Sequence, residues 1–85
     1  MKRYIVQYTR PARKDLEALP TELQDRIVAA IDGLQENPRP HGSKKLKGSD
    51  EYRIRVGNYR VIYEIHEKTV VVLIVRVSDR KDAYR

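Results

Sequence analysis

Apolar and polar side chains alternate most regularly along residues 52–63, Tyr-Arg-Ile-Arg-Val-Gly-Asn-Tyr-Arg-Val-Ile-Tyr. Strict alternation predicts half-buried strands. Gly57-Asn58 at the centre is typical of a two-residue hairpin turn, because glycine tolerates a positive φ. The turn fixes the register, so we expect Arg55 opposite Arg60 and Arg53 one pleat away. One face of this hairpin is then apolar, and the other carries three arginines.

The flanking segments predict the remaining elements. Residues 3–8 are β-branched and aromatic and predict a strand. Apolar positions at helical spacing predict two helices, separated by the helix-breaking Pro20. Thr9 is the expected N-cap of the first helix; Thr21 and Gln24 have capping-box spacing at the start of the second, which should end at Asn37-Pro38.

The C-terminal half predicts a loop and a further strand. Residues 38–50 have loop composition, whereas residues 70–77 are almost continuously apolar, as in a strand buried on both faces. The expected fold class is therefore α+β. We predict one domain, residues 1–85, with an N-terminal strand and a helical hairpin packed on one face of a small, mainly antiparallel four-stranded sheet.

The last strand also carries an expectation about register. A turn around Glu67-Lys68 would place Val72 opposite Tyr63, and it would place Leu73 and Val75 beside the arginines together with Ile62. These three side chains would form an apolar patch on the arginine face. Such a patch marks a binding site unless the tail of the chain covers it.

Positive charge is concentrated in the segment that leads into and through the hairpin. The net charge is +6, and residues 37–60 carry seven basic and two acidic side chains. Lys44, Lys45 and Lys47 lie in the predicted loop and are candidate RNA-binding residues. A localised basic patch is the electrostatic signature of a nucleic-acid binder. No cysteine, signal-peptide pattern or membrane span is present in the sequence, so we expect a cytoplasmic protein with no membrane partner, metal or cofactor.

Two interpretations of the arginine face remain open at this point. The arginines could be solvated or paired with Glu51 and Glu64, or they could bind a row of phosphates through bidentate hydrogen bonds. The sequence contains no conventional nucleophile motif. RNA supplies its own nucleophile, the 2′-hydroxyl, so arginines that stabilise charge and a tyrosine of lowered pKa, with Tyr84 as candidate, could cleave it.

The chain resembles the RelE/ParE toxin superfamily over nearly its whole length. The resemblance rests on Leu46-Lys47-Gly48, on residues 52–63, and on residues 75–85, Val-Arg-Val-Ser-Asp-Arg-Lys-Asp-Ala-Tyr-Arg. It is closest to the RelE branch, whose members cut mRNA in the ribosomal A site and are neutralised by a cognate antitoxin. Many relatives carry Gly-His where this chain has Ser78-Asp79, which removes a candidate imidazole.

The resemblance implies a site, partners and two alternatives. The implied catalytic residues are Arg53, Arg55, Arg60, Arg80 and Tyr84. The implied partners are a RelB-like antitoxin, the 70S ribosome with mRNA in the A site, and operator DNA reached only through the antitoxin. The alternatives are a ParE-type inhibitor of DNA gyrase, which shares the fold but lacks the catalytic set, and a non-catalytic nucleic-acid-binding module.

Overall fold

A computed structural model describes residues 3–79 of the chain. It contains two helices and five strands. The elements in chain order are β1 (Ile5–Tyr8), α1 (Arg10–Glu17), α2 (Thr21–Gly33), β2 (Lys44–Lys45), β3 (Glu51–Val56), β4 (Tyr59–His66) and β5 (Val71–Asp79).

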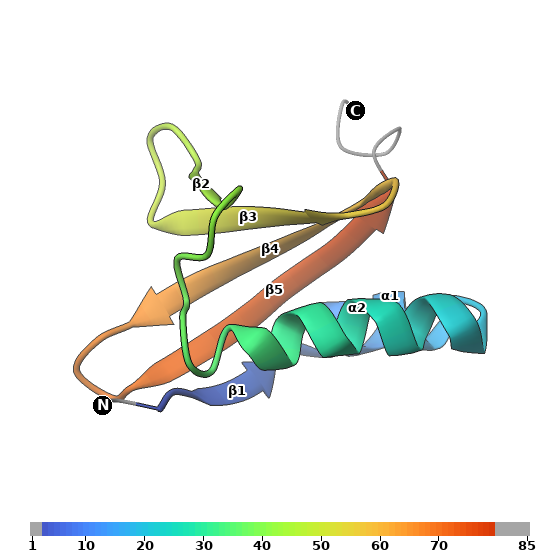
Figure 1. Cartoon of the computed structure of the whole chain (residues 1–85), viewed down its shortest axis with the longest axis horizontal. Helices are drawn as coiled ribbons and strands as arrows, with labels where there is room; N and C mark the ends of the chain where they lie inside the picture. Colours follow the sequence, from blue (N-terminus) through green and yellow to red (C-terminus); the bar gives the residue numbers. More distant parts are fainter. Residues whose placement is uncertain (1–2, 80–85) are drawn as a thin grey trace.

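The strands form one mixed sheet in the order β1-β5-β4-β3-β2. β1 runs parallel to β5, and the other neighbouring pairs are antiparallel. The helices lie on one face of the sheet, and the chain then crosses from α2 to β2 at the edge opposite β1 (Figure 1). The predicted α+β class is confirmed. The sheet has five strands instead of four, because β2 forms within the segment that we expected to be a loop.

Apolar burial stabilises the layer between the helices and the sheet. Alternation along β3, β4 and β5 turns one side chain in two toward the helices, which the half-buried pattern predicted for β3 and β4. Neither helix in the described part of the chain has the length and apolar character needed to cross a bilayer. The buried apolar side chains are Tyr4, Ala12, Leu16, Ile27, Ile31, Leu34, Ile54, Val61, Tyr63, Val72, Ile74 and Val77.

The helix termini agree with the sequence only in part. Thr9 caps α1 as predicted, because its hydroxyl accepts a hydrogen bond from the Ala12 N–H at 3.2 Å. The capping box at Thr21 is wrong: the N-cap of α2 is Pro20, and the Gln24 side chain instead donates to the Leu19 carbonyl at 2.7 Å. α2 also ends at Gly33, before the predicted Asn37-Pro38 stop.

The expected register of β4 and β5 is wrong. The connecting turn takes in residues 67–70, so Val72 lies opposite Ile65 instead of Tyr63. A register shift then occurs where Ile62 pairs with Arg76 and Tyr63 pairs with Ile74, which leaves Val75 as an extra residue in β5. This is a β-bulge, and beyond it the buried positions fall on odd-numbered instead of even-numbered residues. β5 is consequently buried at alternate residues instead of on both faces.

The segment of β5 beyond β1 is held by α1 and its cap. The Thr9 hydroxyl donates to the Val75 carbonyl at 2.8 Å. The Asp15 carboxylate accepts from the Val77 N–H at 2.9 Å and forms an ion pair with Arg76 Nε at 2.9 Å. This ion pair raises the pKa of the Arg76 guanidinium. These contacts satisfy backbone groups that an edge strand would otherwise leave to water.

Candidate nucleic-acid interface

The hairpin of β3 and β4 brings the predicted arginines onto one face of the sheet. Arg55 lies opposite Arg60, and Arg53 lies opposite Ile62, as the sequence predicted. Gly57 opens the turn with a φ of 59°, in the left-handed region that glycine adopts without strain. Arg55 and Arg60 both line a shallow hollow of about 30 Å³ beside the turn. Two guanidinium-bearing side chains therefore border the same small depression.

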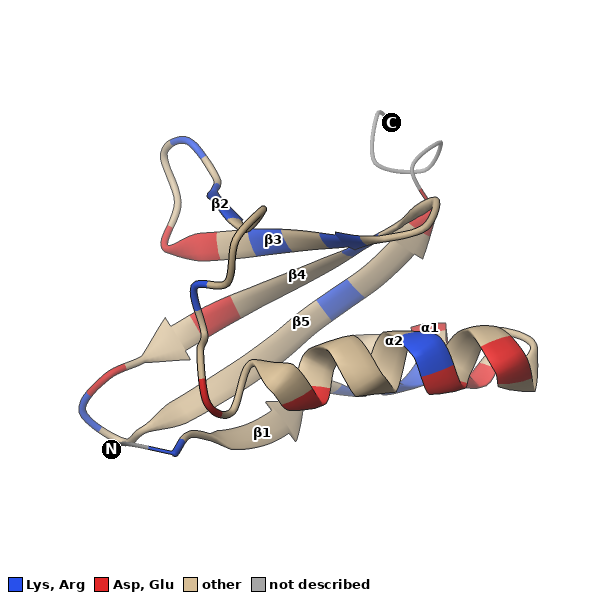
Figure 2. Ribbon diagram, in the orientation of Figure 1, with Lys and Arg blue, Asp and Glu red and all other residues tan. Residues whose placement is uncertain are grey.

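The three lysines are divided between different positions. Lys44 lies opposite Arg53, so it extends the arginine face by one strand. Lys45 lies opposite Tyr52 and so occupies the other face, while Lys47 lies in the turn that follows β2. Figure 2 shows basic residues gathered on β2, β3 and the adjoining part of β4, whereas α2 carries several acidic residues.

The arginines of the cationic face differ in exposure. Arg55 is exposed and makes no ion pair within residues 3–79. Arg53 and Arg60 are half-buried, and their Nε atoms are shielded from solvent. Glu64, one of the carboxylates that could have neutralised this face, accepts from His66 Nε2 at 2.8 Å. Arg55 is thus the arginine of this face that is most accessible to a phosphate, which it could bind through charge-assisted hydrogen bonds.

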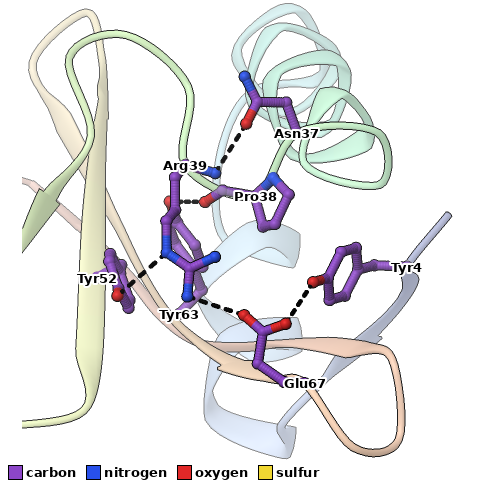
Figure 3. Close-up of polar contacts among 7 residues, drawn as sticks. All are labelled: Tyr4, Asn37, Pro38, Arg39, Tyr52, Tyr63 and Glu67. Carbon is purple, nitrogen blue, oxygen red and sulfur yellow. Dashed lines mark hydrogen bonds and ion pairs between the residues drawn. The ribbon is translucent and has the colours of Figure 1, made fainter. Parts of the chain in front are cut away.

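Arg39 is a residue of this region that sequence reasoning did not identify. It lies in the chain between α2 and β2, and its guanidinium carbon is 5.3 Å from the centroid of the Tyr52 ring. Its Nε donates to the Tyr52 hydroxyl at 3.3 Å, and one Nη donates to Glu67 at 2.8 Å (Figure 3). The hydrogen bonds to Tyr52 and Glu67 raise the pKa of Arg39. The only sequence signal was an arginine between two prolines.

Tyr63 joins the same network from the core. Its hydroxyl donates to the Pro38 carbonyl at 2.7 Å, and its ring stacks on Tyr52 with centroids 5.9 Å apart. Burial is the main cause that raises the pKa of Tyr63 to about 12. Glu67 also accepts from the Tyr4 hydroxyl at 2.8 Å, and this hydrogen bond raises the pKa of Tyr4. One carboxylate thus joins the start of the chain to the segment that precedes β2.

Arg26 is the second residue that sequence reasoning missed. It is an exposed side chain of α2, and a β carbon placed on Gly57 would lie 3.8 Å from its Nη2 atom. The helical hairpin therefore brings one more guanidinium to the tip of the arginine-bearing hairpin. No sequence pattern indicated this, because the contact depends on how α2 packs on the sheet.

Other predicted features are only partly within the structure. Arg80 and Tyr84 lie outside the described residues. Ile62, Leu73 and Val75 are half-buried, and Leu73 lies opposite Glu64 instead of Ile62. Within residues 3–79 no group of His, Asp and Glu side chains could hold a metal ion. In the described part of the chain, the cationic face therefore lies next to the half-buried apolar side chains Ile62, Leu73 and Val75.

Comparison with known proteins identifies the family. The family described as "ParE toxin of type II toxin-antitoxin system, parDE" matches residues 6–84. Toxin RelG of Mycobacterium tuberculosis is 35% identical over 86 residues, covering 96% of this chain and 97% of that protein. The putative toxin RelE1 of Methanocaldococcus jannaschii is 34% identical over 87 residues, covering 98% and 97%.

A solved structure agrees with these relatives. The toxin in the RelBE2 toxin–antitoxin complex of Mycobacterium tuberculosis superposes with a TM-score of 0.81 at 32% identity, covering 92% of this chain and 99% of that one. The agreement extends over sequence, fold and nearly the full length of both chains. The chain therefore belongs to the RelE/ParE superfamily, the toxins of type II toxin–antitoxin systems.

Proposed function

We propose that this toxin is a ribosome-dependent endoribonuclease that enters the A site in the cytoplasm and cleaves the mRNA there. The observation that carries the proposal is the pairing of Arg55 with Arg60 across the hairpin, with Arg53 and Lys44 on the same face. Like charges directly opposite each other destabilise a sheet by up to about 1 kcal/mol. A polyanion would turn this repulsion into binding, which gives the arrangement a functional reason.

The proposed chemistry uses the nucleophile that RNA carries. The 2′-oxygen attacks the adjacent phosphorus as its proton is removed, and the bond from phosphorus to the 5′-oxygen breaks. The leaving oxygen takes up a proton, and a 2′,3′-cyclic phosphate forms. Arg55 and Arg60 would stabilise the extra negative charge of the pentavalent phosphorane, while Arg53 and Lys44 would bind flanking phosphates.

The remaining roles fall to residues named from the family resemblance. Arg80 would add a further guanidinium at the scissile phosphate, and Tyr84 would assist proton transfer. Lys45 and Lys47 would bind RNA beside this centre, one on the other face of the sheet and one in the turn after β2. The reaction as proposed needs no metal or cofactor, because the charge stabilisation comes from arginines.

The proposal is tested with Arg60→Ala in a reconstituted translation reaction. We expect wild-type protein to cut mRNA inside codons only when ribosomes are present. Removal of one charge-stabilising group should slow cleavage by about 10²–10³-fold without unfolding the protein. The matched control is Arg13→Ala, which removes an exposed arginine of α1 and should leave the rate within about threefold. Full activity of Arg60→Ala would contradict the proposal.

The same reaction separates the alternative functions. A gyrase inhibitor would leave mRNA intact and would stall DNA supercoiling in a parallel assay. A non-catalytic binding module would do neither, and it would only retain nucleic acid in a salt-sensitive way. The arginine face, together with Arg80 and Tyr84, favours the nuclease over the gyrase inhibitor, and the cleavage assay decides between the nuclease and a non-catalytic binding module.

We also propose that a RelB-like antitoxin covers the cationic face and the apolar side chains next to it. The solved relative from Mycobacterium tuberculosis is a toxin–antitoxin complex. Ile62 and Leu73, on β4 and β5, are half-buried apolar side chains beside the cationic face, and Ile5 at the far edge of the sheet is 62% exposed. An amphipathic, acidic segment would match both the apolar and the basic parts. Operator DNA would be reached only through this antitoxin, and addition of the purified antitoxin should restore translation in the same reaction.

A further inference from the structure

β2 is poorly stabilised by its own strand pairing. It contains two residues, both of them exposed lysines, and it pairs only with β3 at the edge of the sheet. Lys44 lies directly opposite Arg53, and like charges in such a pair oppose the pairing. Strands this short do not hold their place without help from tertiary contacts. Some other contact must therefore keep Lys44 next to Arg53.

The contacts of the segment before β2 supply that help. Pro38 is held by the buried Tyr63 hydroxyl at 2.7 Å, and the next residue, Arg39, is held by Tyr52 and Glu67. A turn follows, because the Ser43 N–H donates to the Pro40 carbonyl at 3.0 Å. The chain between Pro38 and Lys44 is thus anchored at its start and folded back once. Fixing the start of this segment restricts the positions that β2 can take beside β3.

Arg39 is the charged member of this anchor, and it reaches two separate parts of the sheet. Tyr52 belongs to β3, and Glu67 lies in the turn between β4 and β5 (Figure 3). Hydrogen bonds that involve a charged group are stronger than neutral ones. Because Glu67 accepts from Arg39, the guanidinium is already engaged by a carboxylate and is poorly suited to bind a phosphate itself.

We propose that Arg39 is a positioning residue that acts through Tyr52 and Glu67 to hold β2 against β3, so that Lys44 and Arg53 form one binding surface for RNA. The inference deepens the proposed nuclease function and rests on it for the identity of the ligand. It assigns Arg39 no contact with the reacting atoms. It predicts that loss of Arg39 weakens substrate binding while the chemical step is retained.

The first measurement is amide hydrogen exchange followed by NMR. The Leu46 N–H donates to the Glu51 carbonyl at 2.8 Å, so it reports directly on the pairing at the end of β2. We expect Arg39→Ala to speed its exchange by about tenfold. The Thr9 N–H, which donates to the Ile74 carbonyl at 3.0 Å, is the reference amide in the other half of the sheet and should not change.

The second measurement is cleavage of mRNA on programmed ribosomes. For Arg39→Ala we expect KM to rise roughly three- to tenfold while kcat stays within about twofold. The matched control is Arg13→Ala. Arg13 is an exposed side chain of α1, the helix that packs against β5. Its loss removes the same charge and should leave both KM and the Leu46 exchange rate unchanged.

Glu67→Gln separates positioning from direct binding of RNA by Arg39. This change removes a negative charge and leaves the Arg39 charge in place. If Arg39 acts through Glu67, KM rises; if Arg39 binds phosphate directly, the released guanidinium and the added net charge lower KM. Tyr4→Phe removes the other hydrogen bond to Glu67 and controls for its loss.

The outcomes are distinct. Faster Leu46 exchange and a raised KM in both Arg39→Ala and Glu67→Gln support the inference. Unchanged Leu46 exchange in Arg39→Ala, or a lowered KM in Glu67→Gln, overturns it. If the wild-type protein cuts no mRNA on ribosomes, the proposed nuclease function fails, and the exchange measurement alone then decides whether Arg39 holds β2.

Discussion

The two halves of the sheet are stabilised in opposite ways. The half formed by β1, β5 and β4 supplies most of the buried side chains of the sheet, among them the fully buried Val72 and Ile74. The half formed by β3 and β2 pairs Lys44 with Arg53, and at its border Arg55 lies opposite Arg60 of β4. Burial of apolar surface stabilises the first half, whereas charge repulsion opposes the second.

The comparison teaches where the chain gives up stability for binding. The cationic half contributes only Ile54 to the buried core of the described chain, and polar contacts of Arg39 and Tyr63 connect it further to that core. A protein of this size has a modest core, so it can tolerate only a limited amount of such repulsion. This difference predicts that mutations in the two halves change the free energy of unfolding in opposite directions.

The largest expected effect lies in the helix-covered half. Ile31 of α2 is fully buried, so Ile31→Ala should lower the free energy of unfolding by about 2–5 kcal/mol. The matched control is Ile5→Ala, because Ile5 is 62% exposed and its truncation should cost less than about 0.5 kcal/mol. Urea denaturation at neutral pH measures both. If both variants lost the same unfolding free energy, Ile31 would not be part of the stabilising core.

An intermediate effect is expected at the boundary between the halves. Burial raises the pKa of Tyr63 to about 12, above the ordinary tyrosine value of 10.0. Below pH 10 the hydroxyl is neutral in both the folded and unfolded states. Between pH 10 and 12 it ionises first in the unfolded chain, so the free energy of unfolding should fall by about 2–3 kcal/mol. Denaturation at pH 7 and pH 11.5 measures this loss, which should be smaller in Tyr63→Phe.

The smallest effect should have the opposite sign. Arg55→Glu replaces a like-charge pair with an attractive one, so it should raise the free energy of unfolding by up to about 1 kcal/mol at low salt. Screening should shrink the gain as sodium chloride is added. The same variant should lose cleavage activity. A variant that is both less stable and less active would show that the arginines support the fold, against the proposed division.

The elements with strong local patterns could be predicted from the sequence. The hairpin register followed from alternation and from Gly57, because both are local signals, and Thr9 capped α1 as expected. β2 could not be predicted, because two lysines in a glycine-containing loop have no strand pattern and their pairing depends on tertiary contacts. The end of α2 was also missed. Gly33 is the only local signal there, and a single glycine is tolerated inside a helix.

The site divides in the same way. Arg53, Arg55 and Arg60 could be placed on one face because a two-residue turn fixes their pairing. Arg39 and Arg26 could not be found, because their neighbours Glu67 and Gly57 are distant in sequence and come close only through packing. Lys45 was grouped with Lys44 by sequence proximity, but adjacent residues of a strand point to opposite faces.

The extra residue Val75 shifts the alternation of inward and outward side chains along β5 by one position. Before it, Val72 and Ile74 face the helices; after it, Val77 takes that direction, and Arg76 turns away. Without the insertion the guanidinium of Arg76 would enter the hydrophobic layer. Two homologous toxins that differ by this one residue can therefore keep the same interior only if every apolar position downstream has moved by one in sequence.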